Sequence, residues 1–600
     1  MISFTVLFYT GYDSVAIMGL VMLIPSILSP LVFLGFRSSD ISNVNLNVPP
    51  KVSHITFALL YSMSIIYLYT HKVRPLPYFI IITILYVVIL ADIYYLPDIH
   101  TYTILGKIIF SFLNLSWGVN LKYPLFIGDK DVLSHLSNMQ LFSTERSLSA
   151  ISGNYQDFPL WYIFSTMTAD ILQWDISDYS IGFILSGIIS LAGIFMGYSL
   201  VLRITGNQKV AILGVVFLTL HQQFLYYTMY SIPRSVTSIF FIYLLFLCIF
   251  YNLRSLILFS IISSATILYH AASAPFIILI FSFIFGLYYI ANRDVAFFPL
   301  IAFPIVTMSY WLFNSEHIVT VVSSSFLSVF TAGSDSGSSG QLFQEPWVEL
   351  INYSHLTAYI LLVLLSGIIV SKTLSDENNE TITNITHSQL LIIASVLLIP
   401  VAFPGLSRAF SPGNFNLGRI SHYLPIIVSF SAAISANFII QRINKKTIRS
   451  LFLIIFVLVT FFAISNGFVA ADNPTIERTS YTYYLNENEI RSYDHYNSYS
   501  NKEVGADEIS CRYMQDLEGY VGCNQMQLTN NGNVITTQSM NIIRTGEAKK
   551  KPLQVRSNQG DSLVYTKFNT QQRDEQNVVY MNGDVEIWSE SVYNTNTTLS

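Results

Sequence analysis

A long series of apolar runs most restricts how this chain folds. A helix needs roughly 20 mostly apolar residues to cross a bilayer, and about thirteen runs approach that length. The expected fold is mainly α, a polytopic transmembrane helical bundle of about 13 spans. The spans are expected near 14–35, 52–69, 76–96, 180–202, 210–227, 233–250, 254–269, 273–290, 296–313, 355–371, 388–405, 418–441 and 449–466.

The composition agrees with a membrane bundle. Of the 600 residues, 52% are hydrophobic and 11% are charged, whereas soluble domains carry about 25% charged residues. The formal net charge of -5 gives no indication of nucleic acid as a partner. The shorter stretches 102–117, 158–174 and 317–330 are expected to form interfacial or re-entrant helices.

Basic residues in short loops predict the orientation of the bundle, because Lys and Arg are enriched in cytoplasmic loops. The strongest marker is the loop with Arg442, Lys445, Lys446 and Arg449. The other loops predicted to be cytoplasmic contain Lys372, Arg293, Arg254, Arg203 with Lys209, and Lys72 with Arg74. We therefore expect a multi-pass protein of the cell membrane with a cytoplasmic amino terminus and the carboxyl-terminal tail outside.

The chain divides into two predicted domains. Residues 1–469 form the transmembrane domain, with extracytoplasmic loops at 97–179 and 314–354. Residues 470–600 form a soluble extracytoplasmic domain, small and α/β or β-rich. Its run from Asn577 to Trp588 alternates apolar and polar residues around Asn582-Gly583, which predicts a hairpin. Cys511 and Cys523 are expected to pair as a disulfide if the tail lies in an oxidising compartment.

Acidic residues in the first outer loop are candidates for chemistry. Asp129 and Asp131 precede His135, and Asp131 and His135 share a face if this segment is helical. A carboxylate here could accept the proton of an acceptor hydroxyl or bind a divalent metal ion. The alternative is a helix start, where acidic residues are common.

A second candidate is the acidic and aromatic run from Asn154 to Tyr162. Tyr155 and Asp157 suit sugar binding, since rings stack on sugars and carboxylates bind hydroxyls. The alternative is an aromatic belt at the membrane interface.

A third candidate is a set of cations and histidines at the predicted outer ends of spans. Ionisable groups at membrane depth are costly and usually functional, and arginine binds phosphate oxygens in a bidentate manner. Arg408 and Arg419 stand out because they occur against the positive-inside trend. The alternative is snorkelling to the interface. The set is His221, Arg234, His270, Arg408, Arg419 and His422.

This arrangement resembles the GT-C class of membrane glycosyltransferases, and in particular archaeal proteins similar to protein mannosyltransferases. The resemblance rests on Gly128-Asp129-Lys130-Asp131 with His135, on Tyr155 to Leu160, on Tyr269 to Ser273 at an outer end, and on Val579 to Gly583 in the tail. The chain departs from the family by placing three predicted spans before the acidic loop. It also lacks the Trp-Trp-Asp-Tyr-Gly signature of oligosaccharyltransferases, which argues against transfer of a whole glycan to asparagine.

The resemblance implies a sugar donor linked to polyprenyl (dolichyl) phosphate, used on the extracytoplasmic face with a glycan, protein or lipid acceptor. Asp129 or Asp131 would then be catalytic, with His135, Tyr155, Asp157, Arg234, His270, Arg408, Arg419 and His422 binding substrate. A divalent metal cofactor is left open. Two other classes remain: a flippase or transporter of lipid-linked sugars, and a non-catalytic cell-surface assembly protein.

Overall fold

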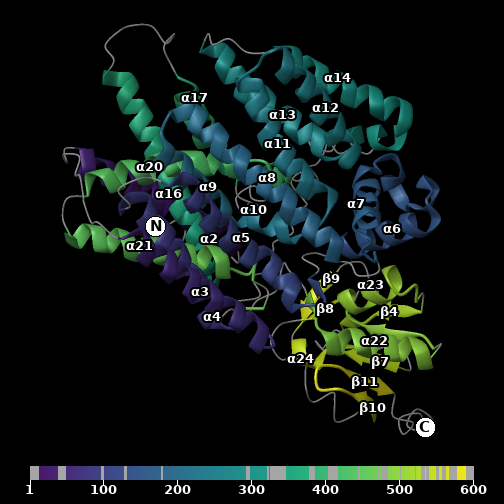
Figure 1. Ribbon diagram of the computed structural model, residues 1–600. Helices are drawn as coiled ribbons and strands as arrows, with labels where there is room; N and C mark the ends of the chain where they lie inside the picture. Colours follow the sequence, from purple (N-terminus) through teal and green to yellow (C-terminus); the bar gives the residue numbers. More distant parts are fainter. Residues whose placement is uncertain are drawn as a thin grey trace.

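The protein is a helical bundle followed by a smaller domain (Figure 1). Among the described residues this domain contains two sheets, and a third, two-stranded sheet joins it to the bundle. The computed structural model describes residues 13–37, 49–95, 100–126, 131–176, 180–291, 297–320, 323–324, 346–376, 386–402, 417–443, 446–470, 472–473, 484–500, 502–520, 522–528, 534–535, 540–548, 553–556, 563–566 and 577–589. Asp129 and Arg408 lie outside these residues.

The helices of the bundle are α2 (Asp13–Arg37), α3 (Pro50–Thr70), α4 (Leu76–Tyr95), α5 (Thr101–Lys122), α6 (Asp131–Glu145), η1 (Leu148–Ala150), η2 (Gly153–Asp157), α7 (Leu160–Leu172), α8 (Ser180–Thr205), α9 (Gln208–Leu220), α10 (Gln222–Met229), α11 (Pro233–Ile249), α12 (Leu253–Tyr269), α13 (Ser273–Ile290), α14 (Phe297–Asn314), α16 (Pro346–Asp376), α17 (His387–Leu397), α18 (Ile399–Ala402), η4 (Leu417–His422), α20 (Pro425–Arg442) and α21 (Lys446–Ser465).

Eight of the described helices are long and apolar enough to cross a membrane, or nine if α9 and α10, which are bent by 59° at His221, form one span. The eight lie in α2, α3, α4, α5, α8, α13, α16 and α20. Five further expected spans correspond to shorter apolar helices of 10–17 described residues. The expected count of about thirteen spans is therefore not confirmed, whereas the polytopic character is.

Helix α5 differs from the sequence-based expectation. The stretch 102–117 was expected to be interfacial, but it belongs to a 22-residue helix with the length and composition of a span. Polar side chains lower the hydropathy of α5, and side chains of neighbouring helices form hydrogen bonds with them. Lys107 pairs with Asp92 of α4 at 2.6 Å and donates to Ser53 of α3. Asn114 accepts a hydrogen bond from Tyr78 of α4.

Contacts at the two ends of the bundle change the expected placement of loops. Arg74, expected in a cytoplasmic loop, forms a buried ion pair at 2.6 Å with Asp472, which follows α21 and precedes the tail. Tyr123, just after α5, donates to the same carboxylate at 2.6 Å. At the opposite end, Lys209 lies 5.5 Å from the ring centroid of Tyr94. Helices α4 and α5 therefore run in opposite directions between the two ends.

These contacts show at which end of the bundle each loop lies when the helices are counted back from the tail. The loop of Lys72 and Arg74 lies at the tail end of the bundle, so the predicted placement of this loop opposite the tail does not fit this order. The segment 97–179 does not lie on one side, because α5 runs from one end of the bundle to the other. The start of α2 then falls at the tail end, so the predicted placement of the amino terminus opposite the tail does not fit this order.

The carboxyl-terminal domain contains the helices α22 (Glu487–Tyr499), α23 (Glu508–Asp516) and α24 (Thr545–Ala548). Its main sheet has the order β10-β11-β7-β3-β4, in which β3 is parallel to β4 and β7, and the other pairs are antiparallel. These strands are β3 (Val504–Ala506), β4 (Cys523–Gln525), β7 (Met540–Ile543), β10 (Asn577–Met581) and β11 (Glu586–Ser589). The second sheet, β6-β5-β8-β9, comprises β5 (Gln527–Leu528), β6 (Val534–Ile535), β8 (Leu553–Arg556) and β9 (Leu563–Thr566).

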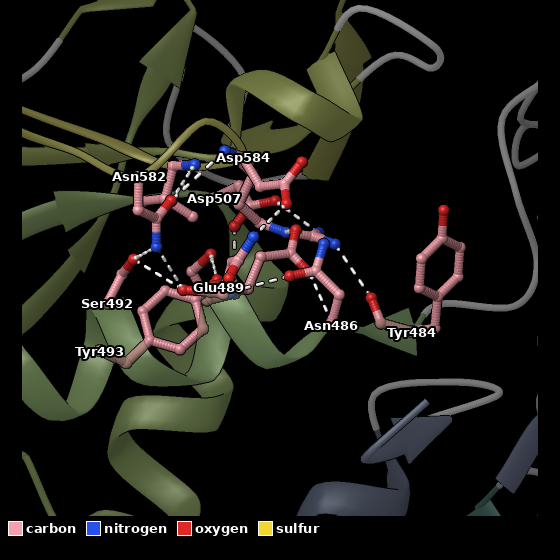
Figure 2. A network of polar contacts seen from close by, with 12 residues as sticks. Tyr484, Asn486, Glu489, Ser492, Tyr493, Asp507, Asn582 and Asp584 are labelled. Atoms are coloured by element: carbon pink, nitrogen blue, oxygen red, sulfur yellow. Dashed lines mark hydrogen bonds and ion pairs between the residues drawn. The ribbon is translucent and has the colours of Figure 1, made fainter. Parts of the chain in front are cut away.

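The predicted hairpin is confirmed as β10 and β11, with Gly583 at a φ of 92° in the turn. Asn582 of this turn donates to Ser492 of α22 at 2.7 Å, which fixes the hairpin against the helix. Beneath it, the buried Arg544 forms ion pairs with Glu489 at 2.7 Å and Asp507 at 3.3 Å (Figure 2). This network joins β7, α22 and the start of α23.

Several contacts hold the domain against the bundle. The sulfur atoms of Cys511 and Cys523 are bonded at 2.10 Å, which fixes α23 to β4. Asp516 of α23 accepts a hydrogen bond from Ser134 of α6 at 3.0 Å. The short strand β1 (Leu125–Phe126) pairs with β2 (Tyr484–Leu485), so the chain entering α6 and the chain entering the domain run side by side. The domain therefore contacts the segment that carries Asp131 and His135.

Candidate functional site

Helix α6 presents the first candidate residues. Its apolar side chains Val132, Leu133 and Leu136 are buried, so the helix is fixed against its neighbours by an apolar face. Asp131 is the first residue of α6 and is exposed, and His135 follows one turn later and is buried. An acid at a helix start is favoured by the helix dipole, so this position agrees with the structural alternative as well as with a chemical role.

Aromatic residues surround His135. Its Nδ1 lies 2.7 Å from the hydroxyl of Tyr162 of α7, and its ring packs edge-on against Tyr155 of η2 with centroids 4.7 Å apart. Burial, and then the charge of Arg234, lower the pKa of His135 to about 3. His135 is therefore neutral at ordinary pH and acts as a hydrogen-bonding group.

Cationic side chains approach this group from α11 and η4. Arg234 follows Pro233 at the start of α11 and is hydrogen-bonded to Tyr227 of α10. The Tyr227 hydroxyl lies 3.0 Å from Nε2 of His422, and Nδ1 of His422 lies 3.1 Å from Oε1 of Gln223. The bend between α9 and α10 thus places α10 where its polar residues hold η4.

Two arginines stand next to each other in this arrangement. Burial, and then the charge of Arg234, lower the pKa of Arg419. Tyr227 and Tyr423 act on the pKa of both arginines. Both side chains keep accessible surface. Two guanidinium groups in one cluster suit binding of an anion.

His270 is a buried histidine of this group, and several of the other members affect its pKa. It lies in the turn between α12 and α13, with Nδ1 2.8 Å from the Ser273 hydroxyl, which also accepts from Tyr423 at 2.7 Å. Burial lowers the pKa of His270 well below its usual value, and nearby groups add to the effect. These groups are Arg234, His135, Arg419 and His422.

Tyr155 is influenced by both the acid and the cations. Burial raises the pKa of its hydroxyl, and three charged side chains act on it, namely Arg234, Asp131 and Arg419. The structure therefore brings together seven of the residues proposed from the sequence, which we call the outer polar cluster. Its members are Asp131, His135, Tyr155, Arg234, His270, Arg419 and His422.

Four proposed residues are not part of the described cluster. His221, at the bend between α9 and α10, accepts a hydrogen bond from the backbone N–H of Gln223 and packs edge-on against Tyr359. Asp157 ends η2, and the contact described for it is with α14, where its carbonyl oxygen accepts from the Tyr310 hydroxyl at 2.5 Å. Asp129 and Arg408 lie outside the described residues. Across the residues that are described, no group of three or more His, Cys, Asp or Glu side chains could hold a metal ion.

Sequence reasoning missed several partners of the cluster. Tyr227 and Gln223 occur in α10, where a single polar residue gives no signal of its own. Tyr423 directly follows His422 and could have been suspected from that position. Ser273 and Tyr162 end two runs named in the sequence analysis, but no role was assigned to either residue.

No protein-family model matches the chain, and no curated protein sequence matches it. The solved structures similar to it include crystal structures of the oligosaccharyltransferase of Archaeoglobus fulgidus.

The apo form of that enzyme is 10% identical with a TM-score of 0.44, and the match covers 71% of this chain and 64%, just under two thirds, of that chain. The form tethered to an acceptor peptide containing the NVT sequon is 9% identical with a TM-score of 0.42, over 79% and 75% of the two chains. The complex with Zn and sulfate is 10% identical with a TM-score of 0.41, over 79% and 73%.

Proposed function

We propose that the protein is a membrane glycosyltransferase that transfers a sugar from a polyprenyl-phosphate-linked donor to an acceptor hydroxyl on the extracytoplasmic face. One observation carries the proposal. Asp131 and the pair Arg234 and Arg419 all affect the pKa of the same hydroxyl, that of Tyr155, within one cluster. Glycosyl transfer from a lipid phosphate needs a base for the acceptor and cations for the leaving group.

The proposed step is a single displacement at the anomeric carbon. Asp131, or Asp129 three residues beyond β1, takes the proton of the acceptor hydroxyl. The acceptor oxygen forms a bond to the anomeric carbon while the bond from this carbon to the phosphate oxygen breaks. The electron pair leaves with the lipid phosphate, whose charge Arg234 and Arg419 stabilise. We propose that Arg408 also stabilises the charge of this phosphate.

The neutral histidines and the tyrosines have a different role in this proposal. His135, His270 and His422 bind and orient substrate by hydrogen bonding, since burial keeps them uncharged. Tyr155 faces both sides of the cluster and is suited to pack against the sugar. Asp157 is proposed only as an outer contact to substrate, because its described contact is with Tyr310.

The test is a transfer assay in membrane vesicles with a panel of polyprenyl-phosphate sugars. Asp131→Asn or Asp129→Asn should lower transfer by about 10²–10⁴-fold, as expected for loss of a general base. Glu145→Gln, at the exposed far end of α6, is the matched control and should keep full activity. Protein level and membrane insertion should be normal in all variants.

Two outcomes would contradict the proposal. If both single variants and the double variant keep full transfer, the catalytic assignment is wrong. If the unmodified protein transfers no sugar while vesicles containing it move a lipid-linked sugar across the membrane, a flippase replaces the transferase.

A further inference from the structure

The bend between α9 and α10 releases a backbone carbonyl from its usual partner. His221 has an extended backbone with a ψ of 121°, and the helix axis turns by 59° there. The backbone N–H of His221 donates to the carbonyl of Leu218 at 3.1 Å, whereas in an unbroken α-helix it would donate to that of Phe217. The Phe217 carbonyl therefore needs another donor, because an unpaired carbonyl is costly inside a membrane.

Helix α16 supplies that donor and contacts both sides of the bend. The hydroxyl of Tyr359 donates to the Phe217 carbonyl at 2.6 Å, and its ring packs edge-on against His221 with centroids 5.2 Å apart. His355 lies one turn before Tyr359, and its Nε2 lies 2.8 Å from Oε1 of Gln222, the first residue of α10. The side chains of His221, Gln222, His355 and Tyr359 are at most 1% exposed. Two buried residues of α16 therefore fix where α10 begins.

Helix α10 in turn holds the cationic side of the outer polar cluster. Oε1 of Gln223 can only accept, so Nδ1 of His422, 3.1 Å away, carries the proton of the ring. Nε2 of the neutral ring is then an acceptor, and the Tyr227 hydroxyl donates to it at 3.0 Å. Tyr227 lies one turn after Gln223 and is hydrogen-bonded to Arg234. The position of α10 thus determines both the tautomer of His422 and its distance from Arg234.

Arg419 depends on the same contacts through η4. A 3-10 helix has three residues per turn, so Arg419 and His422 lie on one side of η4. A shift of α10 would move His422, and with it Arg419, relative to Arg234. Both arginines proposed to bind the donor phosphate are therefore held by α10, one through Tyr227 and the other through η4.

We propose that His355 and Tyr359 are positioning residues, which fix the bend and so set the spacing of Arg234 and Arg419 for the donor phosphate. This inference rests on the proposed function, because it assigns residues that act on the same donor site. Neither residue touches substrate, and each acts through α10. The rival is a purely structural role, in which α16 only stabilises the bundle.

The first experiment measures steady-state kinetics with each substrate varied in turn. Tyr359→Phe and His355→Ala each remove one hydrogen bond to the bend. Each should raise the KM for a polyprenyl-phosphate sugar roughly tenfold, as for loss of one buried hydrogen-bond partner, and leave the KM for the acceptor unchanged. His355→Gln should restore the normal value, since its amide Nε2 can donate to Gln222.

The control separates positioning from stability. Tyr243→Phe removes a hydroxyl that donates to the carbonyl of Ala192 in α8 at 3.3 Å, so it should change neither KM. Unfolding of each variant in detergent is measured alongside. Equal rises in both KM values, failure of His355→Gln to restore the donor KM, or lower stability without a change in the donor KM would overturn the inference.

The second experiment measures binding without transfer. Radiolabelled polyprenyl phosphate is bound to the purified full-length protein and to three variants, Tyr359→Phe, Gln223→Ala and the double variant. Each single variant should bind roughly tenfold more weakly. If Tyr359 acts through α10, the double variant should also bind about tenfold more weakly, whereas independent effects would multiply to about a hundredfold. A hundredfold loss would contradict the proposed route.

The two experiments separate failure of this inference from failure of the proposed function. If transfer and lipid binding are normal in the variants, the positioning role is wrong and the transferase stands. If binding follows the expected pattern but the unmodified protein transfers no sugar, the positioning role stands and the transferase is wrong. If the unmodified protein binds no polyprenyl phosphate, both are wrong.

Discussion

Arg234 and Arg419 are the residues on which the proposed chemistry depends most. The charge of Arg234 lowers the pKa of Arg419, and Tyr227 and Tyr423 act on the pKa of both arginines. Placing two like charges together costs free energy. An anionic ligand between them would recover that free energy. Donor binding should therefore stabilise the outer polar cluster.

Arg234→Ala and Arg419→Ala should therefore weaken use of the donor more than use of the acceptor. The KM for a lipid-phosphate sugar should rise by about tenfold or more, since charged hydrogen bonds contribute roughly 1.5–3 kcal/mol. Arg254→Ala, an exposed arginine at the start of α12, should change neither. Steady-state kinetics with each substrate varied in turn would check this. Equal losses for both substrates would speak against a phosphate-binding role.

His135 should remain neutral far below the pH at which histidines usually gain a proton. Its pKa is lowered from 6.5 to about 3 by burial and by Arg234, whereas in the unfolded chain it would take up a proton below pH 6.5. Its contribution to stability is then fully present above pH 6.5 and is lost as the pH falls from 6.5 toward 3. Nitrogen NMR of the imidazole should show the neutral form at pH 5. A protonated ring at that pH would contradict the buried position.

At the level of residues, the sequence predicted which side chains belong to the cluster better than it predicted the contacts between them. The positive-inside rule singled out Arg419, and helical spacing placed His135 one turn after Asp131. The tyrosines that connect these groups could not be predicted, because a tyrosine in an apolar helix usually belongs to the core. Asp157 was grouped with Tyr155 by proximity in sequence, but the 3-10 turn η2 directs its described contact toward α14.

Among the elements, α5 shows why hydropathy alone missed a crossing helix. Lys107, Asn114 and several serines interrupt its apolar character, and each of the first two has a partner on α3 or α4. A buried ion pair can be hidden inside a bundle where a lone charge could not. Sequence windows score each helix alone, so they cannot include the partner that makes Lys107 acceptable.

The pair of Lys107 and Asp92 allows this interpretation to be tested. Asp92→Ala should destabilise the bundle by about 3–5 kcal/mol, because it leaves Lys107 buried without its acid. The double replacement Asp92→Leu with Lys107→Met should be much less harmful, since it removes both charges. Unfolding of the purified protein in detergent would give the difference. If the double variant is as unstable as the single one, burial of an unpaired charge is not the cause.

On the scale of the whole molecule, the tail domain and the acidic segment belong together. Strands β1 and β2 pair, α6 contacts α23, and Asp472 joins the start of the tail to Arg74 and Tyr123. These contacts connect parts of the chain hundreds of residues apart, which no local pattern can reveal. The hairpin was predictable from alternation and turn chemistry, whereas the docking of the tail against α6 was not.

The same contacts favour a topology that differs from the one predicted from basic loops. Lys72 follows the end of α3, and its neighbour Arg74 bonds to Asp472 at the tail. Gln208 is the first residue of α9. Its neighbour Lys209 lies over the ring of Tyr94 at the other end of the bundle. Because an ion pair cannot join residues across a bilayer, the Lys72 loop and the tail must share one side, with Gln208 on the other.

Cysteine labelling with an impermeant maleimide on intact cells should follow this division. Lys72→Cys and Ser498→Cys, both at exposed positions, should be labelled together from outside. Gln208→Cys should react only after the membrane is permeabilised, and the native Cys248 is buried and should stay silent. Labelling of Ser498→Cys without Lys72→Cys would restore the topology predicted from the positive-inside rule and would contradict the contact between Arg74 and Asp472. Labelling of all three from outside would contradict the passage of α4 and α5 through the bilayer.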